Sequence, residues 1–243
     1  MSRRTLKWVG LSFLGLILVL AVALALFNWN WLKAPIEKRF LERTGRELSI
    51  GGDLRVKLGF PLAHVDAAQV TFANPTWAAE KQMLTADHVA FAIDLPALLS
   101  GRYLLPEVRL TRPVLDLERS SDGRANWRLD PQQQGGQHKS RIGLVRLDAG
   151  KLLYDDAADG TSVRADISTT TPQPSVKAGK PGDAGLAIVA TGRHKGVSFT
   201  ARGIGGPAIA LTKDTAPYPI SLEATVGKSS IKADGTITGL LDV

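Results

Sequence analysis

The chain has no cysteine among its 243 residues, which excludes a disulfide framework, a thiol nucleophile, a thiolate metal site and a lipid anchor on cysteine. Its four histidines are far apart and lack the spacing of metal ligands: His64, His88, His138 and His194. The glycines at Gly203, Gly205 and Gly206 lack the lysine of a phosphate-binding loop, and a turn explains them better. We therefore predict that the protein is not an enzyme and holds no metal or cofactor.

Aromatic residues make up only 6% of the chain, and no dense basic patch accompanies its formal net charge of +7. Nucleic-acid-binding surfaces concentrate Lys and Arg on one face, so we expect no nucleic-acid partner. One looser basic run follows an apolar segment: Lys33, Lys38, Arg39, Arg43 and Arg46. Anionic lipid headgroups would attract such a run, and a solvated helix face explains it equally well.

A long uncharged stretch, residues 8–27, is present behind Arg3, Arg4 and Lys7. At about 1.5 Å of rise per residue, a helix of this length spans the hydrocarbon core of a bilayer. The stretch therefore predicts a single transmembrane helix. Basic residues before the span keep the N-terminus in the cytoplasm, which in a bacterium places the anchor in the inner membrane and the body in the periplasm.

A cleaved signal peptide is the alternative interpretation of this stretch. Ala21, Ala23 and Ala25 provide small residues at the spacing that signal peptidase requires. Against cleavage, the apolar run is longer than the core of a signal peptide, and it ends in aromatic and basic residues. Both interpretations send the body to the same compartment.

Beyond the span, residues 35–44 have helical spacing, and Gly45 suits a left-handed helix end, so we predict a short helix next to the membrane. The apolar period then changes from 3.6 to 2, which predicts strands. These strands are expected at residues 54–58, 89–95, 108–111, 114–118, 144–147, 152–155, 163–167, 186–191, 197–201, 220–226 and 230–237. The body is therefore predicted to be mainly β.

A second short helix is predicted at residues 96–100, where Pro96 suits the first turn. Two polar segments without periodicity, residues 131–140 and 172–184, are expected to be loops. These features divide the chain into a cytoplasmic tip with its anchor (1–33), a first β region with short helices (34–130) and a continuing β region (141–243).

A weak internal repeat occurs within the β region. Val108, Arg109 and Leu110, followed by Leu115 and Leu117, recur 37 residues later as Val145, Arg146 and Leu147, followed by Leu152 and Tyr154. We interpret each copy as two strands joined by a short turn, repeated along the sheet.

A long sheet with one apolar face needs something to cover that face, and the chain has no long apolar helix after the span. The sheet can close into a barrel, stack on a second sheet, or curl into a trough covered by a ligand. Sandwich packing is the most frequent of these outcomes for many short strands. In the trough, we expect the lining to include Val89, Phe91, Ile93, Val108, Leu110, Leu115 and Leu117.

Four segments in this order resemble the N-terminal region of AsmA-family proteins. They are TGRELSIGGDL at residues 44–54, NPTWA at 74–78, LPALLSG at 95–101 and DGRANW at 122–127. Together with the N-terminal span, the resemblance covers residues 3–127 and continues less distinctly at residues 190–196 and 218–220. From turn and packing chemistry, we expect Asn74, Trp77, Asn126 and Trp127 to support the fold rather than to contact a substrate.

The resemblance implies an inner-membrane protein, related to TamB and to the chorein-type bridge proteins, whose N-terminal anchor precedes a curled, trough-like antiparallel β-sheet. It implies phospholipid acyl chains as the ligand, carried in a hydrophobic groove toward the outer membrane in support of envelope integrity. It also implies a longer chain, so we interpret this one as a fragment or an unusually short member. An anchored scaffold that presents edge strands to outer-membrane assembly components is the alternative function, and an enzyme is a third class.

Overall fold

A computed structural model describes Gly15 and residues 27–102, 104–128, 141–170, 185–205 and 218–237. Apart from Gly15 and Phe27, the predicted transmembrane span lies outside the described residues, as do the predicted loops at residues 131–140 and 172–184. Within the described residues, no helix combines the length and the apolar character that a bilayer crossing requires.

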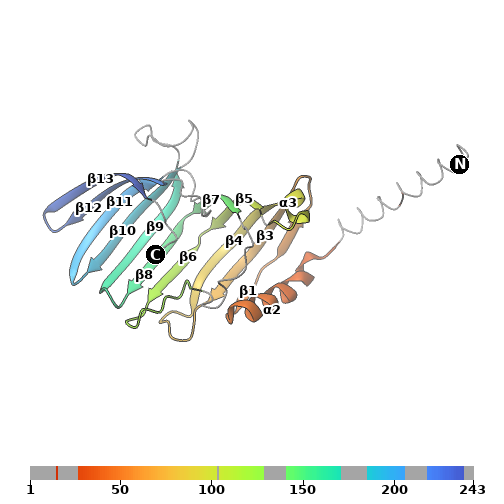
Figure 1. Cartoon of the computed structure of the whole chain (residues 1–243), viewed down its shortest axis with the longest axis horizontal. Helices are drawn as coiled ribbons and strands as arrows, with labels where there is room; N and C mark the ends of the chain where they lie inside the picture. Colours follow the sequence, from red (N-terminus) through yellow and green to blue (C-terminus); the bar gives the residue numbers. More distant parts are fainter. Residues whose placement is uncertain are drawn as a thin grey trace, which may run out of the picture.

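Thirteen strands, two short α-helices and a 3-10 turn make up the described fold (Figure 1). The 3-10 turn η1 (Trp29–Leu32) and helix α2 (Lys33–Thr44) come first, and α3 (Leu95–Leu99) lies between the fourth and fifth strands. The strands are β1 (Leu48–Ile50), β2 (Leu54–Lys57), β3 (Leu62–Ala73), β4 (Gln82–Asp94), β5 (Leu104–Thr111), β6 (Val114–Arg119), β7 (Arg141–Asp148), β8 (Gly150–Asp156), β9 (Thr161–Thr170), β10 (Gly185–His194), β11 (Val197–Gly205), β12 (Tyr218–Val226) and β13 (Ser229–Ile237).

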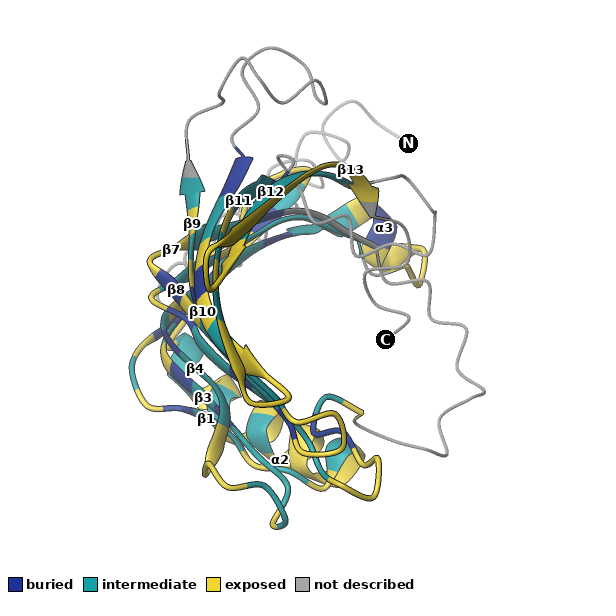
Figure 2. Ribbon diagram, turned by 90° about the vertical axis from the view of Figure 1, so that its left-hand side faces the viewer, coloured by how far each residue is buried: buried dark blue, intermediate teal, exposed yellow. Residues whose placement is uncertain are grey.

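All thirteen strands belong to one open sheet. Its order runs from β1 and β2, both paired with β3, through β4 to the pair β5 and β6, then the pair β7 and β8, and on from β9 to β13 in chain order. Strands on both sides of residues 129–140 therefore share the same sheet. Seen along the stack of strands, the sheet curves into an open trough (Figure 2). This confirms the prediction of a mainly β body whose sheet is not closed.

Both predicted helices are present, each ending where local chemistry stops it. Gly45 follows α2 with a φ of 67° and donates its N–H to the carbonyl of Leu41, so a residue without a Cβ closes the helix. At α3, the Asp94 side chain accepts a hydrogen bond from the N–H of Ala97, and Pro96 occupies the first turn.

The predicted strands are all present, most of them longer than expected, but the sequence analysis missed β1 and β3. The first has only three residues. Strand β3 was missed because its alternation is interrupted: Gln69 has a φ of 53°, and the buried side chains change from odd positions, Ala63 and Ala67, to even ones, Val70 and Phe72. A period of 2 cannot be followed across such a break.

Three residues with positive φ, Gln69, Arg112 and Ala149, lie at the same level across the sheet. Arg112 (φ 45°) separates β5 from β6, and Ala149 (φ 50°) separates β7 from β8. The register places Thr111 beside Asp148, and His88 of β4 between Ala68 and Thr111, so the breaks meet Gln69 across the sheet. Each break shifts the alternation by one residue, which keeps the apolar side chains before and after it on the same face.

The internal repeat is real, but its predicted geometry was wrong. Strands β5 and β6 are not a hairpin, because they follow one another along the same neighbour, β4. They pair in parallel with β7 and β8, with Val108 beside Val145 and Leu115 beside Leu152. The 37-residue offset is thus the register of a parallel pairing, and the sheet is mixed rather than antiparallel throughout.

A buried asparagine closes a gap in the sheet between β4 and β6, which pair over only two positions. Asn126 is fully buried, its Oδ1 accepts the N–H of Glu118 (3.0 Å), and its Nδ2 donates to the Asp116 carbonyl (2.9 Å) and to Asn74 Oδ1 (2.8 Å). Its own N–H donates to the Glu118 carbonyl. Asn126 therefore substitutes for a neighbouring strand, in agreement with the predicted structural role of Asn74 and Asn126.

We expect Asn126→Ala to lower the free energy of unfolding by about 3 kcal/mol, or the melting temperature by about 6–12 °C, because it leaves buried backbone groups of β6 without partners. Thermal unfolding followed by far-UV circular dichroism measures this. Arg128→Ala, an exposed change two residues away, is the control and should shift the midpoint little. Equal midpoints for the two variants would show that the sheet does not depend on Asn126.

Candidate functional site

The predicted lining residues share one face of the sheet. Val89 pairs with Leu110 and Phe91 with Val108, and residues directly opposite one another in neighbouring strands point the same way. Ile93 continues this row opposite Ala63. Leu115 lies beside Leu84 and Leu152, and Leu117 lies beside Tyr154. The structure thus brings Val89, Phe91, Ile93, Val108, Leu110, Leu115 and Leu117 together, and every one of them is half-buried.

The same face continues far beyond these residues. Val145 of β7 extends it beside Val108. From β8 to β12 the register continues it through cross-strand partners that include Leu152, Val163, Ala165, Ile188, Ala190, Phe199, Ala201, Leu222 and Ala224. The sequence predicts strands here but not that their apolar sides join the lining. Alternation within a strand identifies its apolar residues, but only the pairing register shows that the apolar residues of different strands lie on one face.

Burial separates the two faces of the uncovered strands. On β9, Ala165 is buried while its neighbours Arg164 and Asp166 are exposed, and on β10, Ala190 is buried beside exposed Thr191. Among the described residues, no second layer covers the apolar face of these strands (Figure 2). The apolar side chains on this face are therefore shielded from solvent by the curvature of the sheet and by contact with neighbouring side chains. We refer to this surface as the inner face.

A glycine opposite an aromatic residue shows how closely the inner face is filled. Gly192 pairs with Phe199 across β10 and β11. A Cβ at position 192 would lie 2.5 Å from the Phe199 Cζ atom and 2.7 Å from the Ser162 carbonyl oxygen, so only glycine allows the ring to lie flat over the strand.

Helix α2 covers the inner face at one end of the trough. Phe40 of α2 packs edge-on against Phe72 with ring centroids 5.6 Å apart. Beneath the helix lies the best-buried apolar cluster of the described residues, formed by Ile50, Leu54, Ala67 and Val70. The edge strands are capped as well: Glu37 accepts the N–H of Ile50, and Asn30 accepts the N–H of Leu54, both at 2.8 Å. This end of the sheet is closed.

The opposite, outer face carries paired charges. Glu107 accepts hydrogen bonds from Arg109 (3.1 Å) and Arg146 (3.0 Å); burial alone would raise the pKa of Glu107, and the two arginines lower it below its usual value. Farther along, Lys151 pairs with Asp166, and Arg202 with Glu223. The sheet is therefore apolar on one side and mostly polar on the other.

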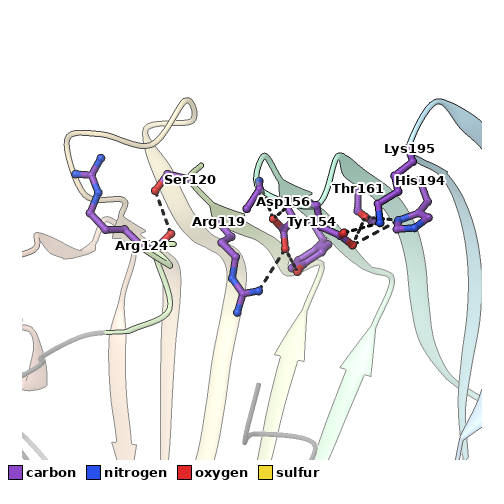
Figure 3. Close-up of polar contacts among 10 residues, drawn as sticks. Arg119, Ser120, Arg124, Tyr154, Asp156, Thr161, His194 and Lys195 are labelled. Carbon is purple, nitrogen blue, oxygen red and sulfur yellow. Dashed lines mark hydrogen bonds and ion pairs between the residues drawn. The ribbon is translucent and has the colours of Figure 1, made fainter. Parts of the chain in front are cut away.

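Polar side chains also gather at the turns along one rim of the sheet (Figure 3). Asp156 is buried and accepts bonds from the Tyr154 hydroxyl and the N–H groups of Ala158 and Asp159. Burial raises its pKa, but these bonds together with Arg119 lower it on balance. The carboxylate thus organises the turn between β8 and β9.

The pKa of Asp116 is shifted in the opposite direction to that of Asp156. Asp116 is buried, and its pKa is raised, chiefly by desolvation, with one hydrogen bond from Asn74 opposing the shift. Two tryptophans of the predicted fold-supporting set make ring contacts. Trp77 lies under the Arg124 guanidinium, and Trp127 lies between Arg119 and Tyr154.

Two of the histidines contact acidic side chains. His88 contacts Asp66 (3.3 Å), and His194 contacts Thr161 and Asp159. His138 lies outside the described residues. Within the part of the chain that the structure describes, no group of three His, Asp or Glu side chains could hold a metal ion. The main candidate for a functional site is therefore the inner face.

Comparison with known proteins identifies relatives of the whole chain. The AsmA family model matches residues 1–207. AsmA family protein YhjG of Escherichia coli strain K12 is 25% identical over 255 aligned residues, which cover 93% of this chain and 37% of that protein. The chain thus spans little more than a third of the length of this relative. No solved structure matches. Because the family model covers most of its length, the chain belongs to the AsmA family.

Proposed function

We propose that the protein binds phospholipid acyl chains on its inner face and conducts them away from the inner membrane, in support of envelope integrity. The observation that supports this proposal is the continuous apolar face, which has no protein layer over β5 to β12 in the described residues. Apolar surface of this extent is rarely left to water in soluble proteins and marks a binding surface. Family membership is consistent with an envelope-related role.

Acyl chains suit this surface better than a rigid ligand does. Among the described residues, the inner face is a strip that continues from strand to strand, without a convergent set of polar groups. A flexible chain can follow such a strip, and each buried methylene contributes about 0.8 kcal/mol. The headgroup would stay at the open side of the trough, where it remains hydrated.

The closed end defines where the proposed path begins. Helix α2 follows directly after the predicted transmembrane span and carries exposed basic residues, among them Lys38 and Arg39. Such residues suit anionic headgroups. In this proposal α2 lies at the membrane surface, and the inner face leads from there toward β13.

An anchored scaffold for outer-membrane protein assembly is the second candidate, favoured by one observation. Among the described residues, β13 pairs only with β12, so its outer edge is available for another strand. Bound lipid distinguishes the two functions: native mass spectrometry of the gently extracted protein should detect phospholipid in a conduit and none in a scaffold.

Site-specific photocrosslinking tests the conduit directly. A photoreactive residue at Val108 or Leu110 should capture phospholipid in cells, because both positions face the trough. Arg109 lies between them on the outer face, is exposed, and is the matched control. Ala92 and Asp116 also alternate with inner-face residues, but both are buried and are therefore unsuitable as controls. Equal lipid capture at positions 108, 109 and 110 would contradict the proposal.

The effect of a buried charge should depend on whether α2 covers the site. Phe91→Glu, on the uncovered part of the inner face, should lower stability by less than about 1.5 kcal/mol while abolishing lipid capture, since its carboxylate can remain hydrated. Phe72→Glu places the same charge beneath α2 and should cost at least about 3 kcal/mol. Thermal melts and bound-lipid analysis measure both effects. Cooperative unfolding caused by Phe91→Glu would instead indicate a dry, covered core.

The proposed location can be tested with reporters. A reporter that is active only in the periplasm, fused after Val243, should be active, and the mature chain should retain its N-terminal methionine. Processing after Ala25 would favour the signal-peptide interpretation. Activity of a cytoplasmic reporter at the same position would contradict the location.

A further inference from the structure

A hollow of about 460 Å³ lies where β9, β10 and β11 run side by side, and most of its lining side chains belong to the outer face. The register sets its side chains in two short rows. Arg193 lies between Ser162 and Ser198, and Thr191 lies between Arg164 and Thr200. Gly192 and Phe199 complete the lining, and the six residues of the two rows carry hydroxyl or guanidinium groups, both of which donate hydrogen bonds.

The two arginines differ from several other cations of the outer face, which are paired. Arg109 and Arg146 share Glu107, Lys151 pairs with Asp166, and Arg202 with Glu223. Arg164 and Arg193 have no ion-pair or side-chain hydrogen-bond partner among the described residues.

Asp155 of β8 pairs by register with Ser162 and therefore lies diagonal to Arg164 on the same face, which leaves one positive charge of the arginine pair unbalanced. Two other acids near the pair have partners of their own. Asp166, two residues along β9 from Arg164 on the same face, contacts Lys151. Asp159 contacts His194 and Lys195 at the turn that follows Arg193 (Figure 3). Two like charges diagonal to each other on neighbouring strands repel, because such positions are only about 7–8 Å apart. An anion bound between the two guanidinium groups would offset their electrostatic repulsion.

From this arrangement we propose that the hollow binds a phosphate group. Guanidinium groups bind phosphate through paired, charge-assisted hydrogen bonds, and hydroxyls supply further donors. A tetrahedral phosphate presents oxygens in several directions, which suits donors on three strands better than a planar carboxylate does. The site lies on the face opposite to the proposed acyl-chain path, so it does not depend on that path. Its ligand is a phosphodiester headgroup of a lipid or a free phosphate ion.

Calorimetric titration of the full chain in a neutral detergent, at low ionic strength, tests the site with two probes. One probe is inorganic phosphate, and the other is glycerophosphoglycerol, a phosphodiester headgroup without acyl chains that cannot occupy the inner face. Saturable binding of at least one probe is expected. Tighter binding of the diester would identify a lipid headgroup as the ligand, and tighter binding of phosphate would identify the free ion.

Variants make the assignment specific. Arg164→Gln combined with Arg193→Gln should weaken binding at least tenfold, which corresponds to about 1.4 kcal/mol. Thr191→Val, which keeps both charges and removes a central hydroxyl, should weaken it severalfold. Arg202→Gln is the matched control, because it removes an equally exposed outer-face arginine that has its own partner, Glu223. Circular dichroism melts confirm that each variant is folded.

Three results would overturn the proposal: no saturable binding of either probe, unchanged binding by the double variant, or an equal loss in Arg202→Gln. The last would mean that the probes respond to surface charge in general. Lipid capture at Val108 should be unaffected by the double variant, so failure of this site and failure of the conduit are separate outcomes.

Discussion

In the part of the chain that the structure describes, most of the sheet has only one layer, and the rest of the structure depends on that constraint. Where no second layer covers a strand, hydrophobic burial comes only from neighbouring strands and from curvature. The well-buried residues are accordingly often alanines, such as Ala165 and Ala190, which larger neighbours shelter, while Phe91 remains half-buried. Strand pairing must then supply much of the stability, so where pairing is interrupted, other hydrogen bonds have to satisfy the unpaired backbone groups. Asn126 supplies such bonds between β4 and β6.

Curvature places a second demand on the chain, because a bent strand must keep its apolar residues on one side. The row formed by Gln69, Arg112 and Ala149 meets this demand with positive φ angles at the same level of successive strands. Such a conformation is unfavourable for residues with a Cβ. Cross-strand bonds hold it in place; for example, the N–H of Arg112 donates to the Asp148 carbonyl at 2.7 Å.

The sequence was sufficient to predict strands with one apolar side, because alternation is a local property. It also placed α2 and α3, whose ends depend on Gly45 and on Pro96. Strand β3 was missed because the break at Gln69 interrupts the period of 2.

The parallel pairing of β5 with β7 could not be deduced, although the 37-residue repeat contained its register, because a repeat does not show whether its copies lie side by side. The extent of the inner face was missed for the same reason. Each strand indicated its own apolar residues, and only long-range pairing joins Val108 to Val145 and Leu152 to Ala165.

Because the sheet has a single layer over most strands, substitutions on its inner face and on its outer face can be tested separately. Val108 and Arg109 are consecutive residues, yet one contacts its neighbours inside the trough and the other pairs with Glu107 outside. Charge pairing outside keeps the polar surface soluble without adding bulk to the inner face. The two ends of the sheet differ in how they are covered. At one end Glu37, Asn30 and α2 close the edge, whereas at β13 Ile231 is 63% exposed. Within the described residues, α2 covers one end of the trough and no helix covers the other end at β13, an asymmetry that suits the proposed path leading away from α2.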